Sequence, residues 1–323
     1  MPRIICLGEI LVDQIANYAQ LGQDQVLSWQ AYPGGSPANI ACAIARLGES
    51  CALISCIGND QIGQDLLAEI KQKGVDPTGI QINPTARTRE VYVSRDAKGD
   101  RRFINFSGTG STAFADTKLQ ADQLPIELFE AADFLVLGTL ALAQTDSMAA
   151  VKRAIELAEQ NYLRVVVDVN WRPLFWDNAD RAPDLIYDLL EHADFLKLSA
   201  DEAEWLFHTS DPTEIGNKLE HLEAVLVTDG EHGCRYRISD RTAQFGGFRV
   251  NAIDTTGAGD AFVAGFVYQL CQHKLQELNQ PEISDRIVRY ACAVGAISTQ
   301  SIGAMSNLPS HNQVQDFLTQ QQA

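Results

Sequence analysis

Basic residues are scarce in this chain: 25 Lys and Arg stand against 42 Asp and Glu, which gives a formal net charge of −17. Nucleic-acid binding needs clustered Lys and Arg to neutralise phosphates, so this balance argues against a nucleic-acid partner. It does not argue against a small anionic ligand, because a local glycine-rich loop can bind phosphate within an acidic protein.

Long apolar runs are also missing. No stretch approaches the roughly 18 apolar residues needed to span a bilayer, and the N-terminus lacks the apolar core of a signal peptide. The seven cysteines form no CxxC pair, and their apolar surroundings indicate reduced core residues rather than a zinc or redox site. We therefore expect no membrane partner and a reducing compartment, the cytoplasm.

Two common nucleotide-binding signatures are absent as well. The chain contains neither the P-loop pattern, GxxxxGK followed by Ser or Thr, nor the dinucleotide-binding pattern GxGxxG. Any phosphate chemistry must therefore depend on another kind of glycine-rich turn.

What the sequence does contain is an alternation of short apolar runs with longer amphipathic stretches. This alternation predicts a mostly parallel sheet with helices on both faces, whose ligands gather at the carboxyl ends of the strands. A single domain over residues 1–323 can accommodate it. The expected buried strands cover residues 4–7, 52–57, 134–137, 165–169, 195–198 and 225–227, and helical patterns cover residues 62–73, 147–160 and 184–192.

Two stretches interrupt the alternation. Residues 14–32 are polar and mixed, whereas residues 89–94 and 102–107 have strand character on either side of a turn signal at residues 96–100 (DAKGD). We expect both stretches to form strands outside the main sheet. The alternative is a surface hairpin without a function.

The most informative segment reads DTTGAGD, residues 254–260, followed by small and apolar residues that suit a buried helix. The Gly257-Ala258-Gly259 turn therefore lies at a helix N-terminus, where free backbone N–H groups and the helix dipole stabilise a transferring phosphoryl group. Asp260 lies beside the turn and can accept a proton from an attacking hydroxyl. The alternative is that Asp260 only caps the helix and the glycines only make a tight turn.

A second cluster covers residues 34–48 (GGSPANIACAIARLG). Ser36 is a good N-cap, Pro37 suits the first helical position, and Gly48 suits a helix end, so we predict a helix between them.

The start of this cluster has the groups that a polyol needs. The backbone amides of Gly34 and Gly35 and the side chain of Asn39 can bind neutral hydroxyls, and Asp13 and Asn17 can reach the same ligand. A well-capped helix with no ligand is the alternative.

Together, and in this order, the two clusters resemble the signatures of the ribokinase-like family of carbohydrate kinases. The N-terminal signature covers residues 34–48 and continues to Gly58-Asn59-Asp60 and Gly63, and the C-terminal one covers residues 254–260. The resemblance spans nearly the whole chain. It implies a three-layer α/β/α sandwich with a mostly parallel sheet, and a small β lid over the sugar formed by about residues 14–32 and 89–107. It leaves open a homodimer formed through the lid.

The resemblance also implies ATP and Mg²⁺, with Asp260 as catalytic base and Gly257, Ala258 and Gly259 as the anion hole. Many family members also hold a monovalent cation such as K⁺ near the anion hole. The implied nucleotide contacts are Ser199, where the family usually has Asn, and Thr228, Gly230 and Gly233; Glu202 would act on Mg²⁺ through water; and the region matching the cation site contains Asp254, Thr256 and residues 298–307.

Within the family, fructokinases are the most similar. Residues 32–39 (YPGGSPAN) are similar to their substrate loop, and residues 168–176 (DVNWRPLFW) are similar to a strand end that would bring Asn170 and Arg172 to the active site. Residues 106–111 (FSGTGS) depart from the fructokinase pattern Arg-Asn-Pro-Ser-Ala-Asp, so a lid arginine is absent at that point.

The leading hypothesis is therefore transfer of the ATP γ-phosphate to a hydroxyl of free fructose. The alternatives in the same chemistry are ribose, 2-keto-3-deoxygluconate, a nucleoside or a sugar phosphate; Arg87, Arg89, Arg101 and Arg102 keep the last of these open. An alternative of another class is a non-catalytic sugar-binding sensor, which would have no need of a base at Asp260.

Overall fold

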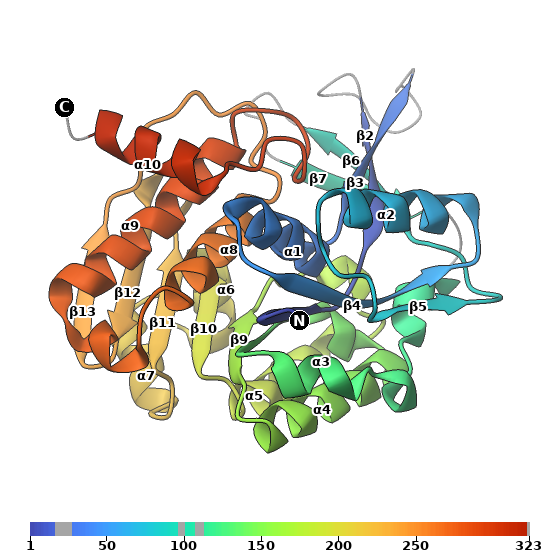
Figure 1. Ribbon diagram of the computed structural model, residues 1–323, viewed down its shortest axis with the longest axis horizontal. Helices are drawn as coiled ribbons and strands as arrows, with labels where there is room; N and C mark the ends of the chain where they lie inside the picture. Colours follow the sequence, from blue (N-terminus) through green and yellow to red (C-terminus); the bar gives the residue numbers. More distant parts are fainter. Residues whose placement is uncertain (17–27, 96–100, 107–112, 322–323) are drawn as a thin grey trace.

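The computed structural model describes residues 1–16, 28–95, 101–106 and 113–321. Nine strands form one sheet in the order β13-β12-β11-β10-β9-β8-β1-β4-β5 (Figure 1). The pairs from β11 to β5 are parallel, and β12 and β13 continue the sheet as an antiparallel hairpin. The strands are β1 (Ile4–Leu7), β4 (Cys51–Gly58), β5 (Ile80–Asn83), β8 (Phe134–Gly138), β9 (Arg164–Asp168), β10 (Phe195–Ser199), β11 (Ala224–Thr228), β12 (Cys234–Ile238) and β13 (Arg241–Phe245).

Helices cover both faces of this sheet because successive strand residues point to opposite sides. In β1, Ile5 and Leu7 pack in one core cluster, and Ile4 and Cys6 pack in the other. The first cluster lies under α3 (Ile126–Ala131), α4 (Thr145–Gln160), α5 (Ala182–Leu190), α6 (Ala200–Phe207) and α7 (Pro212–Lys218), and the second under α1 (Ser36–Leu47), α2 (Gln61–Gln72), α8 (Ala258–Leu270) and α9 (Pro281–Ser298). The predicted three-layer α/β/α class is confirmed.

A second, four-stranded sheet has the order β3-β2-β6-β7, made of β2 (Leu11–Ala16), β3 (Trp29–Gly34), β6 (Glu90–Arg95) and β7 (Arg101–Phe106). β2 is antiparallel to β3 and parallel to β6, and β6 is antiparallel to β7. The two stretches predicted to lie outside the main sheet thus pair with each other. Residues 17–27, 96–100 and 107–112, which contain Asn17 and the departure from the fructokinase pattern, lie outside the described residues.

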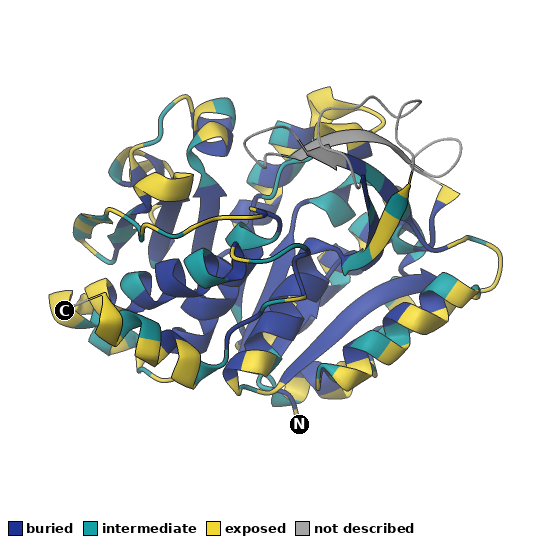
Figure 2. Cartoon of the chain, turned by 90° about the horizontal axis from the view of Figure 1, so that it is seen from above, coloured by how far each residue is buried: buried dark blue, intermediate teal, exposed yellow. Residues whose placement is uncertain are grey.

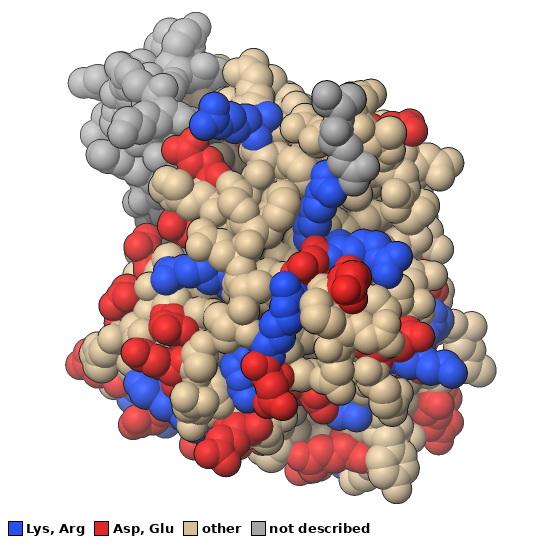
Figure 3. All heavy atoms as spheres, turned by 90° about the vertical axis from the view of Figure 1, so that its left-hand side faces the viewer, with Lys and Arg blue, Asp and Glu red and all other residues tan. Residues whose placement is uncertain are grey.

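The inner strands of the main sheet are buried, the edge strands β5 and β13 are partly exposed, and exposed residues gather on the outer faces of the helices (Figure 2). The last helix, α10 (His311–Gln320), packs through Val314 on a cluster with Tyr268 and Tyr290. Acidic and basic side chains are interspersed over the face shown in Figure 3. No helix in the described ranges is long and apolar enough to cross a bilayer.

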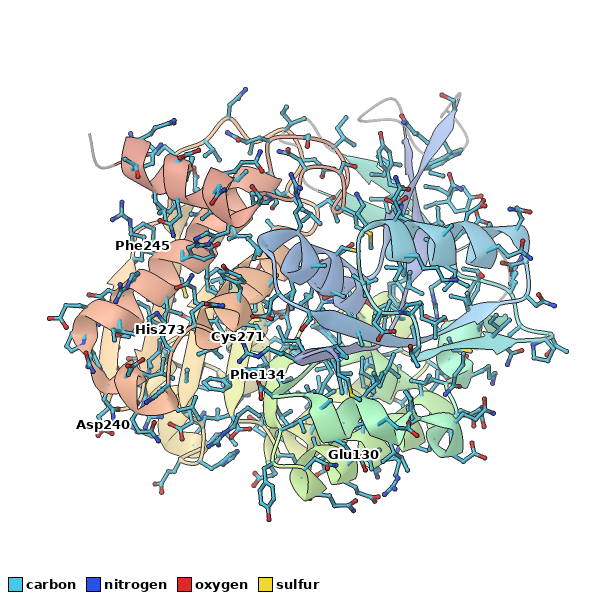
Figure 4. All side chains as sticks on the ribbon, viewed as in Figure 1. Glu130, Phe134, Asp240, Phe245, Cys271 and His273 are labelled. Carbon is cyan, nitrogen blue, oxygen red and sulfur yellow. The ribbon has the colours of Figure 1, made fainter. Side chains whose placement is uncertain are left out.

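All seven cysteines are unpaired thiols, and six of them are buried. Cys271 follows the last residue of α8, at the opposite end of the helix from Asp260, with His273 close after it (Figure 4). This agrees with the prediction that the cysteines are small core residues.

One local prediction is wrong. The helix of the second cluster begins at Ser36, and its N-cap is Gly35, which makes no side-chain capping bond. Gly35 adopts a left-handed conformation, with φ of 100°, which a residue with a side chain rarely adopts. The Ser36 hydroxyl is directed elsewhere, to a partner distant in the sequence.

Candidate active site

A cavity of about 280 Å³ lies where the main sheet, the small sheet and the N-termini of α1, α6 and α8 meet. It is at the carboxyl ends of β10 and β11, as parallel sheets predict. The predicted site residues that line it are Asp13, Gly35, Asn39, Asn170, Arg172, Ser199, Glu202, Thr228, Gly257, Gly259 and Asp260.

Asp260 is the third residue of α8 and is 9% exposed. Its Oδ1 accepts a hydrogen bond from the Ser36 hydroxyl at 2.7 Å, and its Oδ2 accepts one from Asn39 Nδ2 at 2.7 Å. Both oxygens of this carboxylate therefore accept hydrogen bonds from α1, a different helix from the one that carries Asp260.

The turn before Asp260 brings backbone close to the cavity. Gly257 has a left-handed conformation with φ of 72°, and a Cβ there would lie 2.5 Å from Ala304 Cβ. A Cβ at Gly259 would lie 2.9 Å from Lys197 Nζ. The Ala258 N–H donates to Thr255 O at 3.2 Å and Ala258 does not line the cavity, so only the two glycines of the predicted anion hole face it.

The predicted sugar-side residues Asp13, Gly35 and Asn39 line the cavity wall that faces the glycine turn. A Cβ at Gly34 would lie 2.6 Å from Asp13 Oδ2, so this glycine lets the β3 backbone pass close to the carboxylate. Asn39 Oδ1 is buried and has no hydrogen-bond partner among the described residues. A buried acceptor of this kind suits a ligand hydroxyl.

Asn170 and Arg172 reach the cavity from the loop after β9. Asn170 has a left-handed backbone, with φ of 40°, and Arg172 Nη1 donates to the Trp171 carbonyl at 2.8 Å.

Glu202 and Ser199 are held together at the start of α6. The Glu202 carboxylate accepts from the backbone N–H of Trp171 and of Ser199, both at 2.7 Å, while Ser199 Oγ accepts from the Glu202 N–H at 3.2 Å. This capping box fixes Glu202 with its carboxylate at the cavity wall. Gly230 and Gly233 follow β11 but do not line the cavity.

Asp254 is behind the glycine turn and is 1% exposed. Its two oxygens accept from the backbone N–H of Thr256 at 3.1 Å and of Gly303 at 2.9 Å. Asp254 therefore connects the turn to the loop at residues 298–307. Thr256 Oγ1 is buried and has no hydrogen-bond partner in the described part of the chain.

Sequence reasoning missed two charged residues in the cavity wall, Glu9 and Lys197. Lys197 lies in the middle of β10, where a lysine in an apolar run was a signal that could have identified it. Glu9 follows β1, and its side chain accepts from the Ser36 N–H at 2.8 Å.

Lys197 forms a buried ion pair with Asp168, with 2.9 Å between Nζ and Oδ1. Burial by itself lowers the pKa of Lys197, but Asp168 and Glu202 raise it, and the net direction is upward. Burial raises the pKa of Asp168 to about 6, although Lys197 opposes this. Both groups are therefore charged at neutral pH, and the cavity has a fixed cation next to Gly259.

Glu9 gives the fold a distinct pH dependence. Burial raises the pKa of its carboxyl from 4.5 to about 7. The folded state therefore holds this proton more tightly than the unfolded chain does. Its contribution to stability is complete below about pH 4.5 and is lost as pH rises through 7.

We expect the Glu9→Gln substitution to remove this loss, because glutamine stays neutral and can still accept from Ser36. Relative to the wild type, the free energy of unfolding of the variant should change little at low pH and rise above pH 7 by on the order of 3 kcal/mol. Urea unfolding across this pH range measures it, with the exposed Glu130 as the matched Glu→Gln control (Figure 4). A difference that does not vary with pH would contradict the assignment.

The model of the pfkB family carbohydrate kinases matches residues 1–311. The chain belongs to the pfkB family of carbohydrate kinases. This pfkB kinase is 33% identical over 321 residues to "Probable fructokinase-6, chloroplastic" of Arabidopsis thaliana, an alignment that covers 98% of the chain and 82% of the relative.

Two solved structures have the same fold as this pfkB kinase. A fructokinase of Xylella fastidiosa with bound ATP superposes with a TM-score of 0.87 at 25% identity, over 100% of both chains. A double-mutant fructokinase of Vibrio cholerae O395, bound to fructose, ADP and potassium ion, superposes with a TM-score of 0.86 at 29% identity, over 98% of both chains.

Proposed function

We propose that this pfkB kinase transfers the γ-phosphate of ATP to a hydroxyl of free fructose, with Asp260 as the catalytic base. The observation that carries the proposal is the position of Asp260: a buried carboxylate in the cavity, at a helix N-terminus, between polar sugar-side groups and a glycine turn. The names of the similar fructokinases support the sugar.

In this proposal each wall of the cavity has its own task. Asp13, Gly35 and Asn39 orient the sugar, and Asp260 accepts the proton of the hydroxyl that attacks phosphorus. Gly257 and Gly259, at the positive end of α8, stabilise the negative charge that the transferring phosphoryl group carries. Asn170 and Arg172 complete the wall after β9.

Lys197 belongs to this machinery. Its ammonium group donates to Asp168 and has two further N–H groups, beside the point where a Cβ on Gly259 would lie. We propose that it donates to the phosphoryl group as the charge on that group develops.

The residues also suit the ions that ATP chemistry requires. Glu202 presents a fixed carboxylate to the cavity and would hold Mg²⁺ through water. Ser199 and Thr228 would contact the nucleotide inside the cavity, and Gly230 and Gly233 would contact it beyond the cavity wall. Asp254 and Thr256 provide hard oxygen ligands that suit K⁺ behind the glycine turn. Within the described part of the chain, Thr256 Oγ1 has no hydrogen-bond partner. Bound Mg²⁺ would neutralise charge on the phosphates.

The charges around the cavity favour a neutral sugar over a sugar phosphate. Arg89 is 2% exposed and forms a bidentate pair with Asp116, at 2.8 and 3.0 Å, so its charge is already balanced. Asp13 lines the sugar side and would repel a second phosphate. We therefore rank a sugar phosphate below fructose as a candidate substrate.

A panel of sugars tests the proposal, with ATP, Mg²⁺ and either K⁺ or Na⁺ at equal ionic strength. We expect kcat/KM for fructose to exceed that for ribose, glucose and fructose 6-phosphate by at least about tenfold, or about 1.4 kcal/mol, and to be higher in K⁺. A preference for another acceptor would contradict fructose as the substrate. Equal rates in both salts would contradict a specific K⁺ site. ATP and sugar binding without phosphorylation would indicate the sensor.

The small sheet is proposed to act as a lid that excludes water when sugar binds. The unpaired, buried cysteines support a reducing compartment such as the cytoplasm. The cytoplasmic location and a homodimer through the lid stay predictions.

A further inference from the structure

Both side chains that hold Asp260 come from one turn of one helix. Ser36 and Asn39 occupy the first turn of α1, and each donates to a different oxygen of the carboxylate at 2.7 Å. Asn39 also lines the cavity, and its buried Oδ1 has no hydrogen-bond partner among the described residues, so Asn39 can bind both Asp260 and the ligand. Ser36 is 6% exposed, and its hydroxyl donates to Asp260.

Ser36 is itself fixed from another element. Its backbone N–H donates to Glu9 Oε1 at 2.8 Å, and Glu9 is the second residue after β1. The left-handed Gly35 allows this close approach, because a Cβ there would lie 2.5 Å from the Glu9 carbonyl oxygen. The hydroxyl is therefore presented to Asp260 from a rigid junction between β1, β3 and α1.

We propose that Ser36 is a positioning residue for the catalytic base: its hydroxyl fixes Oδ1 of Asp260 and stabilises the ionised carboxylate. The inference rests on the proposed role of Asp260 as base. A carboxylate has about four lone-pair positions on two oxygens, so the bonds from Ser36 and Asn39 leave room for a sugar hydroxyl. A donor to a carboxylate favours its charged form, and its loss lets the carboxylate take up a proton at higher pH.

The consequence appears in the dependence of activity on pH. With MgATP saturating, kcat/KM for the sugar should fall on the acid side as the base of the enzyme–MgATP complex is protonated. Replacing Ser36 by Ala should move this acid limb to higher pH by about one unit, since a hydrogen bond to a charged group is worth that much. Activity should then fall about tenfold on the acid side of the limb and only a few-fold on the plateau.

The experiment measures this profile for the wild type and for the Ser36→Ala, Ser36→Thr and Asp260→Asn variants. The Ser36→Thr variant keeps a hydroxyl and should restore the position of the acid limb. A matched control is Ser284→Ala, which removes a buried hydroxyl from the first turn of α9, away from the cavity. Thermal melting of each variant separates a change in stability from a change in the base.

Four outcomes are decisive. A limb that moves in Ser36→Ala, stays in Ser284→Ala and returns in Ser36→Thr supports the inference. A limb that stays at the wild-type pH in Ser36→Ala, with a uniform loss of rate or none, overturns it. A limb that persists at the same pH in Asp260→Asn belongs to another group, such as the Glu9 carboxyl with its pKa of about 7, and overturns the inference about Ser36. Near-normal kcat in Asp260→Asn would instead reject the proposed base.

Discussion

The Asp260→Asn variant should fold and bind ATP, but its kcat should fall by a factor of roughly 10²–10⁴, which is the usual contribution of a positioned acid–base group. Asparagine has the shape of aspartate and can still accept from Ser36, but it cannot take the proton of the attacking hydroxyl. ATP affinity should change much less, or increase, because a negative charge near the γ-phosphate is removed. Steady-state kinetics with fructose, with ATP binding measured directly, checks both expectations.

The control for this variant is Asp146→Asn, since Asp146 also lies in the first turn of a helix, α4, and is outside the cavity lining. Its kcat should equal that of the wild type. A folded, ATP-binding Asp260→Asn variant with near-normal kcat would contradict the mechanism, and the base would then have to be sought at Asp13.

The second large effect is expected at Lys197. Replacing it by Met removes a cation beside Gly259, and kcat should fall by roughly 10²–10³, as when one donor to a developing charge is lost. The same change leaves Asp168 buried without its partner, which should lower the free energy of unfolding by about 3–5 kcal/mol. Kinetics and urea unfolding of the same preparations give the two numbers.

A double variant separates these two effects. Combining Lys197→Met with Asp168→Asn removes both charges of the buried pair, so most of the lost stability should return. The kcat should stay low, because the donor to the phosphoryl group is still missing. Recovery of kcat together with stability would show that Lys197 acts only through folding.

The periodic parts of the fold could be predicted from the sequence. Each buried parallel strand is a short apolar run, so the runs at residues 4–7 and 195–198 identified β1 and β10. The hairpin of β12 and β13 was missed because Arg235 and Arg237 alternate with apolar residues and imitate a surface segment. Asp240, at the turn between these strands, is labelled in Figure 4.

Partners far apart in the sequence could not be predicted. Local rules made Ser36 an N-cap, but Asp260 accepts from its hydroxyl across 224 positions of sequence. Similarly, the glycine–aspartate string located Asp260 because its chemistry is local, whereas nothing near Glu9 indicated that its carboxyl would meet the Ser36 N–H. Lys197 was missed too, although its charge within an apolar run was a local signal that it needed a buried partner.

The long separation between Asp260 and its donors also bears on protein synthesis. Ser36 and Asn39 are made early, while the carboxylate that they hold follows 224 and 221 residues later. β1 lies between β4 and β8 in the folded sheet. It is the first strand to be synthesised, and it can pair with β8 only after more than a hundred further residues have been made. In the proposed mechanism, a nascent chain that ends before α8 has the sugar-side groups but no base, so we expect activity to require translation of α8.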